Sequence, residues 1–202
     1  MRPTPAYSRI AQLYDLLDLP FEVLRYRRLR RIVFAGVEGR TLDAGVGTGR
    51  NMPFYPREAE VLGIDASPQM LTRAEARRRR LGVSAELRRM DVTALAFPDG
   101  SFDYIIATFL FCVLSERNQR PALEELARVC KPDGEIRLLD YVYSRRPARR
   151  FLMRLWAPLV RRLYDAAFDR DPQRYFAAAG LELVEERFLL ADSIKLYSLR
   201  PK

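Results

Sequence analysis

The chain has 202 residues, a formal net charge of +9 and no histidine. This length suits one well-buried domain, so we expect residues 1–202 to fold as a single unit. The lack of histidine excludes Ser-His-Asp and Cys-His nucleophilic chemistry and the common zinc sites, and we expect no metal. Any proton acceptor in a catalytic site is therefore a carboxylate, a tyrosine, a lysine or water.

No apolar run reaches the roughly eighteen residues that cross a bilayer, and the N-terminus lacks the apolar core of a signal peptide. Cys112 and Cys130 lie in apolar surroundings without metal spacing, which predicts packing residues in a reduced compartment. The pI is near 9.9 and arginine carries most of the positive charge. We expect a cytoplasmic protein with a phosphate-rich partner, either nucleic acid or an anionic membrane; the alternative is a basic protein with no such partner.

Two amphipathic helices are predicted before the core, within 1–34, and the second is rich in arginine. Buried strands follow at about 40–44, 60–64, 84–89, 104–108 and 136–141, with helices at about 51–55, 67–82 and 121–129. After an insertion over 145–170, a helix at 172–179 and a strand hairpin at 181–188 and 194–199 end the chain. Strands that alternate with helices predict an α/β fold with a doubly wound, mostly parallel sheet.

The stretch 41–49 reads Thr-Leu-Asp-Ala-Gly-Val-Gly-Thr-Gly, a strand that leads into three glycines spaced two apart. Such a loop turns sharply and lets a nucleotide-like ligand approach the backbone closely. A second short strand ends in Asp65 about 20 residues later, where a carboxylate accepts hydrogen bonds from ribose hydroxyls. A third strand ends in another acid, Asp91. Together these features predict a cofactor site.

The loop itself discriminates between two cofactor classes. Dinucleotide enzymes need glycine at the sixth position of G-x-G-x-x-G, and this chain has Arg50 there. We expect Asp43 at the mouth of the loop, where a carboxylate would repel a pyrophosphate and attract an ammonium group. S-adenosylmethionine, which carries a cationic amino-acid end and a ribose, fits better.

At this point the chain resembles the class I S-adenosylmethionine-dependent methyltransferases over roughly residues 35–200. The similar pieces are residues 42–49, 63–70, 91 with 97–103, and 126–135. The resemblance implies a Rossmann-like, seven-stranded sheet in which the terminal hairpin adds one antiparallel strand, and S-adenosylhomocysteine as product. The cofactor-binding residues that it implies are Asp43, Gly45, Gly47, Thr48, Gly49, Asn51, Asp65, Ala66, Met70, Asp91, Val92 and Thr108.

The methyl acceptor is a separate question, because one fold serves many acceptors. Nucleic-acid amino-methyltransferases of this class carry an Asp-or-Asn-Pro-Pro-aromatic motif after the fourth strand. This chain has the apolar stretch Thr-Phe-Leu-Phe-Cys at 108–112, without polar groups to pair a flipped base. We therefore expect no nucleic-acid substrate.

The insertion favours a membrane instead. From 149 to 168 the apolar residues fall on one helical face, with Trp156 among them and Arg150, Arg154 and Arg161 opposite. A wide apolar face with an arginine-rich back is typical of a helix in a membrane interface, and the alternative is an ordinary amphipathic helix packed on the sheet. Pro158 is expected to kink or divide this helix.

With these pieces the chain is similar to bacterial phospholipid N-methyltransferases of the group close to the ubiquinone and menaquinone C-methyltransferases. The residues that carry this second resemblance are 7–15, the arginine-rich stretch 25–31, the loop 45–51 and the insertion from Arg145. It implies N-methylation of phosphatidylethanolamine toward phosphatidylcholine by a monomer on the inner face of the cell membrane. A quinone-ring C-methyltransferase and a non-catalytic, membrane-bound S-adenosylmethionine sensor are the alternatives.

For catalysis we single out Asp140 and Tyr141 at the carboxyl end of the fifth strand, and Tyr7 and Tyr14 on the N-terminal helix that would cover them. A carboxylate or phenol there would take part in removing the ammonium proton, and aromatic rings, including Phe109 and Phe111, would hold the methylated cation. The alternative is that these are core aromatics. Arginine is the expected partner of the phosphodiester, with Arg25, Arg28 and Arg145 as candidates beside Arg146 and Arg174.

Overall fold

A computed structural model of the chain describes residues 26–164 and 167–202, except for the side chains of 160–164. The first predicted helix, with Tyr7 and Tyr14, lies outside the described residues, as do Arg25 and the Arg161 side chain. Of the second predicted helix, the structure describes α3 (Arg27–Val33).

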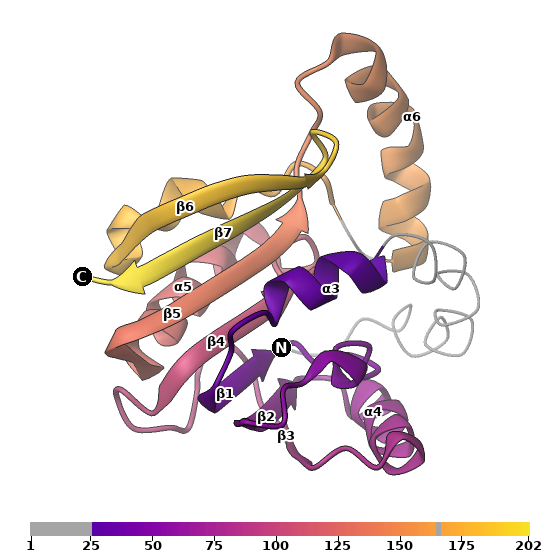
Figure 1. Ribbon diagram of the computed structural model, residues 1–202. Coiled ribbons are helices and arrows are strands. Elements are labelled where there is room, and N and C mark those ends of the chain that lie inside the picture. Colours follow the sequence, from indigo (N-terminus) through magenta and orange to yellow (C-terminus); the bar gives the residue numbers. More distant parts are fainter. Residues whose placement is uncertain (1–25, 165–166) are drawn as a thin grey trace.

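The centre of the molecule is a seven-stranded sheet with the order β3-β2-β1-β4-β5-β7-β6 (Figure 1). Its strands are β1 (Gly39–Ala44), β2 (Ala59–Asp65), β3 (Ala85–Arg89), β4 (Phe102–Thr108), β5 (Cys130–Tyr141), β6 (Leu181–Leu190) and β7 (Ile194–Pro201). The first five pair in parallel, and β7 runs antiparallel to both β5 and β6. The predicted fold class is therefore confirmed, and the strand order reverses between β1 and β4, where open α/β sheets bind ligands.

Helices cover both faces of the sheet (Figure 1). The covering helices are α3, α4 (Pro68–Leu81) and α5 (Glu116–Val129), with 3₁₀ turns η2 (Met52–Phe54), η3 (Pro172–Tyr175) and η4 (Ala177–Ala179). The fourth described helix is α6 (Pro147–Tyr164). Neighbouring strand residues point to opposite faces, so Ile105 packs in the core that contains α5, whereas Ile106 packs in the core that contains α3. This alternation explains why β4 reads as a continuous apolar run.

Local signals in the sequence place α4 correctly. The Ser67 hydroxyl accepts a hydrogen bond from the Met70 amide at 3.3 Å, which makes it the N-cap, and Gly82 ends the helix in the left-handed conformation at φ +63°. Cys112 and Cys130 are buried free thiols, as expected.

Three boundaries differ from the prediction. Helix α5 begins at Glu116 and contains Pro121, which the sequence pattern places at its start. Strand β5 begins at Cys130, so the predicted turn at 131–134 lies inside the strand. At this point the pairing of β4 with β5 shifts its register. The last predicted helix is two 3₁₀ turns, η3 and η4.

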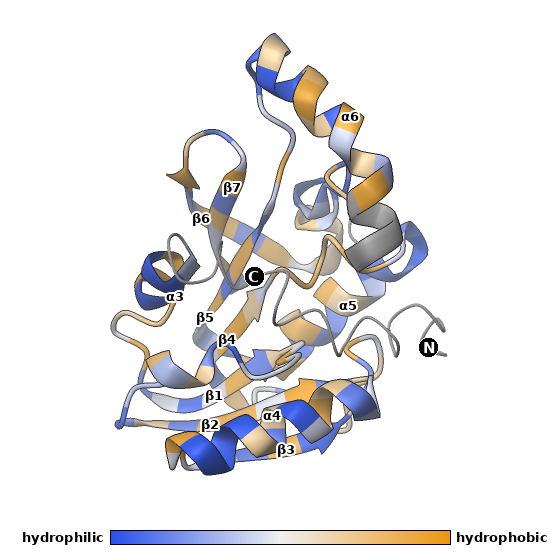
Figure 2. Ribbon diagram, turned by 90° about the vertical axis from the view of Figure 1, so that its right-hand side faces the viewer, coloured by the Kyte–Doolittle hydropathy of each residue, from blue (hydrophilic) through white to orange (hydrophobic). Residues whose placement is uncertain are grey.

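Helix α6 leaves the carboxyl end of β5 and projects away from the sheet (Figures 1 and 2). It is one continuous helix that contains Pro158, so the proline does not divide it. None of the helices in the described part of the chain has the length and apolar character needed to span a membrane.

Gly134 in β5 provides a test of the packing between β4 and β5. A Cβ at Gly134 would lie 2.8 Å from the Asp103 carbonyl oxygen and 2.8 Å from the Cys130 sulfur. We expect Gly134→Ala to lower the free energy of unfolding by about 1–3 kcal/mol, because neither neighbour is a flexible side-chain end. Urea denaturation measures this, with the exposed neighbour Asp133→Ala as control; equal stability of both variants would contradict the packing described here.

Candidate active site

The glycine loop connects β1 to η2, and its three glycines have φ values of +74° (Gly45), +55° (Gly47) and +80° (Gly49). Added Cβ atoms would lie 2.8 Å from Leu110 at Gly45 and 2.7 Å from Met52 at Gly49. At Gly47 nothing lies closer than 3.9 Å. Two glycines therefore let the loop pack against the protein, while Gly47 keeps an open side on which a ligand can approach the backbone.

Asp65 ends β2 directly beside this loop. Its carboxylate accepts hydrogen bonds from the Gly47 amide at 3.0 Å and the Ser67 amide at 2.8 Å. Burial raises the pKa of Asp65, and these two amides lower it. A carboxylate has about four acceptor positions, so two amide donors leave capacity for the two hydroxyls of a ribose.

Apolar and acidic side chains surround the same edge at the ends of β2 and β3. Met70 and Val92 are buried, Ala66 is half-buried, and Asp91 accepts hydrogen bonds from the Thr93 amide and hydroxyl at 3.0 and 2.8 Å. The predicted cofactor residues from the second and third strands therefore lie along one edge of the sheet.

A buried polar network lies beneath the loop. Asp43 is fully buried and accepts hydrogen bonds from the Asn51 amide at 2.9 and 3.0 Å and from the Tyr55 hydroxyl at 2.5 Å. The Arg30 guanidinium, from α3, donates to the side-chain oxygens of Asn51 and Thr108. The side-chain amide of Asn51 thus bridges the buried Arg30 guanidinium and the buried Asp43 carboxylate.

The network corrects the expected position of Asp43. It was expected at the mouth of the loop, but protein partners enclose it. Arg30, from the arginine-rich stretch of the predicted second helix, is only 6% exposed. Burial raises the pKa of Asp43 to about 6, although the hydrogen bonds from Tyr55 and Asn51 and the charge of Arg30 lower it.

Four aromatic rings gather at the carboxyl ends of β4 and β5. Phe109 lies 5.3 Å from Tyr26 and 4.8 Å from Tyr141 between ring centroids, and Phe168 lies 5.5 Å from Tyr141. The hydroxyls of Tyr26 and Tyr141 are hydrogen-bonded at 2.6 Å. We call Tyr26, Phe109, Tyr141 and Phe168 the aromatic cluster. It borders the glycine loop through Leu110, which follows Phe109 and contacts Gly45.

Comparisons with known proteins agree with this geometry. A family model for the methyltransferase domain matches residues 41–134. The phosphatidylethanolamine N-methyltransferase of Cereibacter sphaeroides is 41% identical over 140 residues, which cover 67% of this chain and 68% of that protein. The demethylmenaquinone methyltransferase of Tropheryma whipplei is 34% identical over 180 residues, which cover 84% of this chain and 71% of that protein.

The fold is shared with a solved S-adenosylmethionine-dependent methyltransferase from Aquifex aeolicus, with a TM-score of 0.66 and 21% identity over 97% of this chain and 98% of that one. The chain belongs to the class I S-adenosylmethionine-dependent methyltransferases. Its cofactor is S-adenosylmethionine. In the described residues no group of histidine, cysteine, aspartate and glutamate side chains is arranged to hold a metal ion.

The residues of this methyltransferase fit its cofactor. Gly47 leaves the backbone open, and Asp65 retains acceptor capacity beside it. The cofactor supplies a methyl group on a positively charged sulfur when it is bound. The chain must orient that group, exclude water and present the acceptor, because methyl transfer needs an electron pair of the acceptor atom in line with the methyl carbon.

Asp140 is buried, and its carboxylate accepts hydrogen bonds from the Cys112 amide at 3.0 Å and the Tyr141 amide at 2.8 Å. Burial raises its pKa to about 6. These contacts tie the loop after β4 to the end of β5. Asp140 thus holds two parts of the site in place, which is a positioning role.

The other predicted acceptor residues are dispersed. Phe111 is a buried core residue and is not in the aromatic cluster. Arg28 is exposed on α3, and the exposed Arg145 places its guanidinium 5.8 Å from the Phe188 ring centroid. Arg28 and Arg145 therefore belong to different elements, and neither is part of the aromatic cluster.

Sequence reasoning missed Tyr26 and Phe168 in the cluster, and Tyr55 in the network. Tyr26 lies among arginines and Phe168 near the end of the insertion, so neither is close in sequence to a cofactor motif. Only the packing of α3 and of the returning chain brings them to Tyr141.

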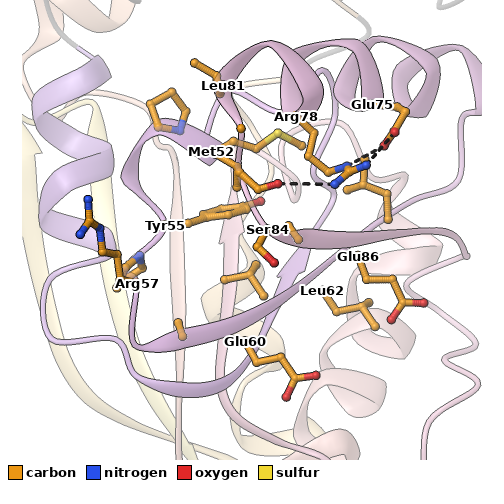
Figure 3. Close-up of a pocket in the computed structure, with 18 of the residues that line it drawn as sticks. Met52, Tyr55, Arg57, Glu60, Leu62, Glu75, Arg78, Leu81, Ser84 and Glu86 are labelled. Carbon is orange, nitrogen blue, oxygen red and sulfur yellow. Dashed lines mark hydrogen bonds and ion pairs between the residues drawn. The ribbon is translucent and has the colours of Figure 1, made fainter.

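A surface hollow of 1140 Å³ lies elsewhere, among η2, the end of α4 and the amino-terminal halves of β2 and β3 (Figure 3). Both arginine and glutamate side chains line it. Arg78 turns toward Glu75, with which it forms a 2.8 Å ion pair. Ligands of open α/β sheets bind at the carboxyl ends of the strands. The hollow is therefore not the active site, although Tyr55 borders both the hollow and Asp43.

Asp65 provides a test of cofactor binding. We expect Asp65→Ala to weaken binding of S-adenosylhomocysteine at least about tenfold, because each charge-assisted hydrogen bond contributes roughly 1.5–3 kcal/mol. Calorimetric titration measures the affinity, and Asp99→Ala, which removes an exposed carboxylate elsewhere, is the control. Unchanged affinity in Asp65→Ala would place the ribose at another residue.

Asp43 provides a test through pH. The ordinary pKa of an aspartate side chain is 3.8 and that of Asp43 in the fold is about 6, so the folded state binds the proton more tightly. The contribution of Asp43 to stability should therefore fall as pH rises from about 4 to about 6, by up to about 3 kcal/mol. Asp43→Asn should remove this part of the pH dependence, measured by urea unfolding across that range. The pH dependence that remains in the variant includes the contribution of Asp140. Identical pH profiles of stability for wild type and variant would contradict the raised pKa of Asp43.

Proposed function

We propose that this methyltransferase transfers methyl groups to the amine of phosphatidylethanolamine, toward phosphatidylcholine, as a monomer at the cytoplasmic surface of a membrane. The observation that carries the proposal is the aromatic cluster beside the glycine loop. Its rings come from the residue before α3, the loop after β4, the end of β5 and the segment after α6. Aromatic faces attract ammonium groups, and this attraction is used to recognise quaternary ammonium ligands.

The cluster already receives one cation. The Arg30 guanidinium carbon lies 5.6 Å from the Phe109 ring centroid. A methylated ammonium has no N–H donor once three methyl groups are present, so aromatic faces bind each successive product where hydrogen-bond acceptors alone would not. This property suits an acceptor that is methylated repeatedly.

The two tyrosines supply the polar part of the site. An ethanolamine ammonium must lose a proton before its nitrogen lone pair can attack a methyl carbon, and the proton passes to water. A phenolic oxygen of Tyr26 or Tyr141 can accept a hydrogen bond from a remaining N–H and so orient the lone pair. The proposal therefore assigns Tyr141 to contact the amine, with Asp140 positioning it.

The relative from Cereibacter sphaeroides, named a phosphatidylethanolamine N-methyltransferase, supports this acceptor. A quinone-ring C-methyltransferase is the second candidate, because the demethylmenaquinone methyltransferase aligns over more of the chain. Aromatic side chains would also stack against a quinone precursor. The cluster alone therefore suits both acceptors, and the product identifies the correct one.

The deciding experiment is incubation of the pure protein with methyl-labelled cofactor and either phosphatidylethanolamine vesicles or a demethylated quinone precursor. The proposal expects label in the phospholipid head group. Label in the quinone precursor instead would establish the second candidate, and label in neither acceptor, with cofactor binding intact, would support the non-catalytic alternative.

Tyr141 provides a further test. We expect Tyr141→Phe to lower turnover of the labelled acceptor at least about tenfold, because the amine loses a hydrogen-bonding partner. A side chain that itself transfers the proton typically contributes about 10²–10⁴-fold, so a loss in that range would indicate a direct role in proton transfer. Affinity for S-adenosylhomocysteine should stay near that of wild type. Tyr104→Phe, on β4 outside the cluster, is the control. Full activity of Tyr141→Phe would exclude its hydroxyl from the reaction.

A further inference from the structure

Helix α6 carries a continuous row of exposed hydrophobic side chains. Phe151, Leu152, Leu155, Trp156 and Leu159, which we call the apolar ridge, are between 44% and 67% exposed. Successive residues of the ridge are one or three positions apart and alternate ones are four apart, which places them along one side of the helix. Elsewhere in the described part of the chain, the large exposed hydrophobic residues are only Leu81 and Val184. Such a concentration on one element marks an interaction surface.

The charge of α6 indicates the partner. Residues 147–164 contain five arginines and no acidic residue. Arg150 and Arg154 are exposed beside the ridge. Two copies of such a helix would repel each other, whereas an anionic bilayer offers both negative head groups and an apolar interior. Charge complementarity therefore favours a bilayer over a second copy of the chain.

The amino end of α6 is fixed by Asp192, in the turn between β6 and β7. One carboxylate oxygen accepts hydrogen bonds from the Ser144 hydroxyl at 2.6 Å and the Arg145 amide at 2.9 Å. The other pairs with the Arg149 guanidinium at 2.5 Å. These contacts, which we call the Asp192 anchor, hold the pKa of Asp192 well below its usual range. The helix is thereby tied to the sheet at its start.

Both ends of α6 also join the acceptor site. Before the helix, Tyr141 belongs to the aromatic cluster, and the Val142 amide donates to the Ser193 carbonyl at 3.0 Å. After the helix, the Ala167 amide donates to the Cys112 carbonyl at 2.8 Å, and Phe168 packs against Tyr141. Figure 2 shows that α6 projects away from the sheet and that its ribbon carries hydrophobic as well as hydrophilic residues. The segments on either side of α6 therefore connect the helix directly to the aromatic cluster.

We infer that the apolar ridge of α6 inserts into the interfacial region of an anionic bilayer, and that the Asp192 anchor holds the helix so that the aromatic cluster faces the lipid head groups. This inference deepens the proposed function and rests on it for the lipid acceptor. The binding itself depends only on α6 and is testable without any methyl transfer.

The test uses the whole protein and vesicles of phosphatidylcholine with or without phosphatidylglycerol. We expect sedimentation with the anionic vesicles, release as salt rises, and a blue shift in the emission of Trp156, the only tryptophan in the chain. Arg150→Glu with Arg154→Glu should weaken binding by at least about 25-fold, since each arginine near the surface contributes about fivefold. Phe151→Ser with Leu155→Ser should abolish the blue shift.

The matched control is Arg80→Glu with Leu81→Ser, an exposed arginine and an exposed leucine on α4, which should bind vesicles like wild type. All variants should keep their affinity for S-adenosylhomocysteine, which shows that they are folded. A wild-type protein that ignores anionic vesicles at low salt would overturn the inference. Dimerisation in solution that the ridge variants abolish would overturn it in favour of a second copy of the chain.

Asp192→Asn separates the anchor from the ridge. This variant should bind anionic vesicles within about threefold of wild type, because the arginines and the ridge remain. Its methylation of phosphatidylethanolamine in vesicles should fall relative to that of a short-chain, monomeric phosphatidylethanolamine. Equal activity on vesicles would overturn the role of the anchor. Vesicle binding without any lipid methylation by wild type would instead refute the proposed function and leave the ridge as a membrane contact.

Discussion

The buried pair of Arg30 and Asp43, bridged by Asn51, is the interaction on which the site depends. Loss of either side chain would remove hydrogen bonds from buried groups of this network, which is destabilising. The bridging amide has a fixed direction, because its oxygen accepts from the guanidinium and its nitrogen donates to the carboxylate. Helix α3, the end of β1 and, through Thr108, the end of β4 are thereby held in one arrangement. The same arginine reaches Phe109, so the cofactor loop and the aromatic cluster share a support.

A second group of contacts extends this support toward α6. Asp140 joins the loop after β4 to Tyr141, and Asp192 joins the following segment to the β6–β7 turn. Two carboxylates thus fix the chain on either side of the point where it leaves the sheet for α6. The aromatic cluster and the proposed membrane helix are consequently connected through a short, fixed segment of chain. A lipid head group at the cluster would then belong to the membrane that α6 is proposed to contact.

Much of the fold could be predicted from the sequence because its signals are local. Ser67 and Gly82 mark the ends of α4, and the strand–glycine–acid pattern from Thr41 to Asp65 locates the cofactor edge. The aromatic cluster could not be predicted in this way, since Tyr26 and Phe168 reach Tyr141 only through tertiary packing. The burial of Arg30 was hidden for a related reason: neighbouring arginines in the same stretch are exposed, and helical spacing alone does not show which one meets Asn51. Pro121 was misread because its position within α5 depends on where Ser115 starts the helix.

The exposed ridge on α6 also bears on the choice that the sequence left open for the insertion. An amphipathic pattern fits both a helix packed on a sheet and a helix at an interface, since both need one apolar side. In the fold, the five residues of the apolar ridge are more than two-fifths exposed, so the described part of the protein does not cover the ridge. Five arginines and no acid on the same helix favour the proposed partner, one that is both apolar and negatively charged. A phospholipid surface meets both conditions, and for an enzyme whose acceptor is a phospholipid it is also the place where the substrate resides.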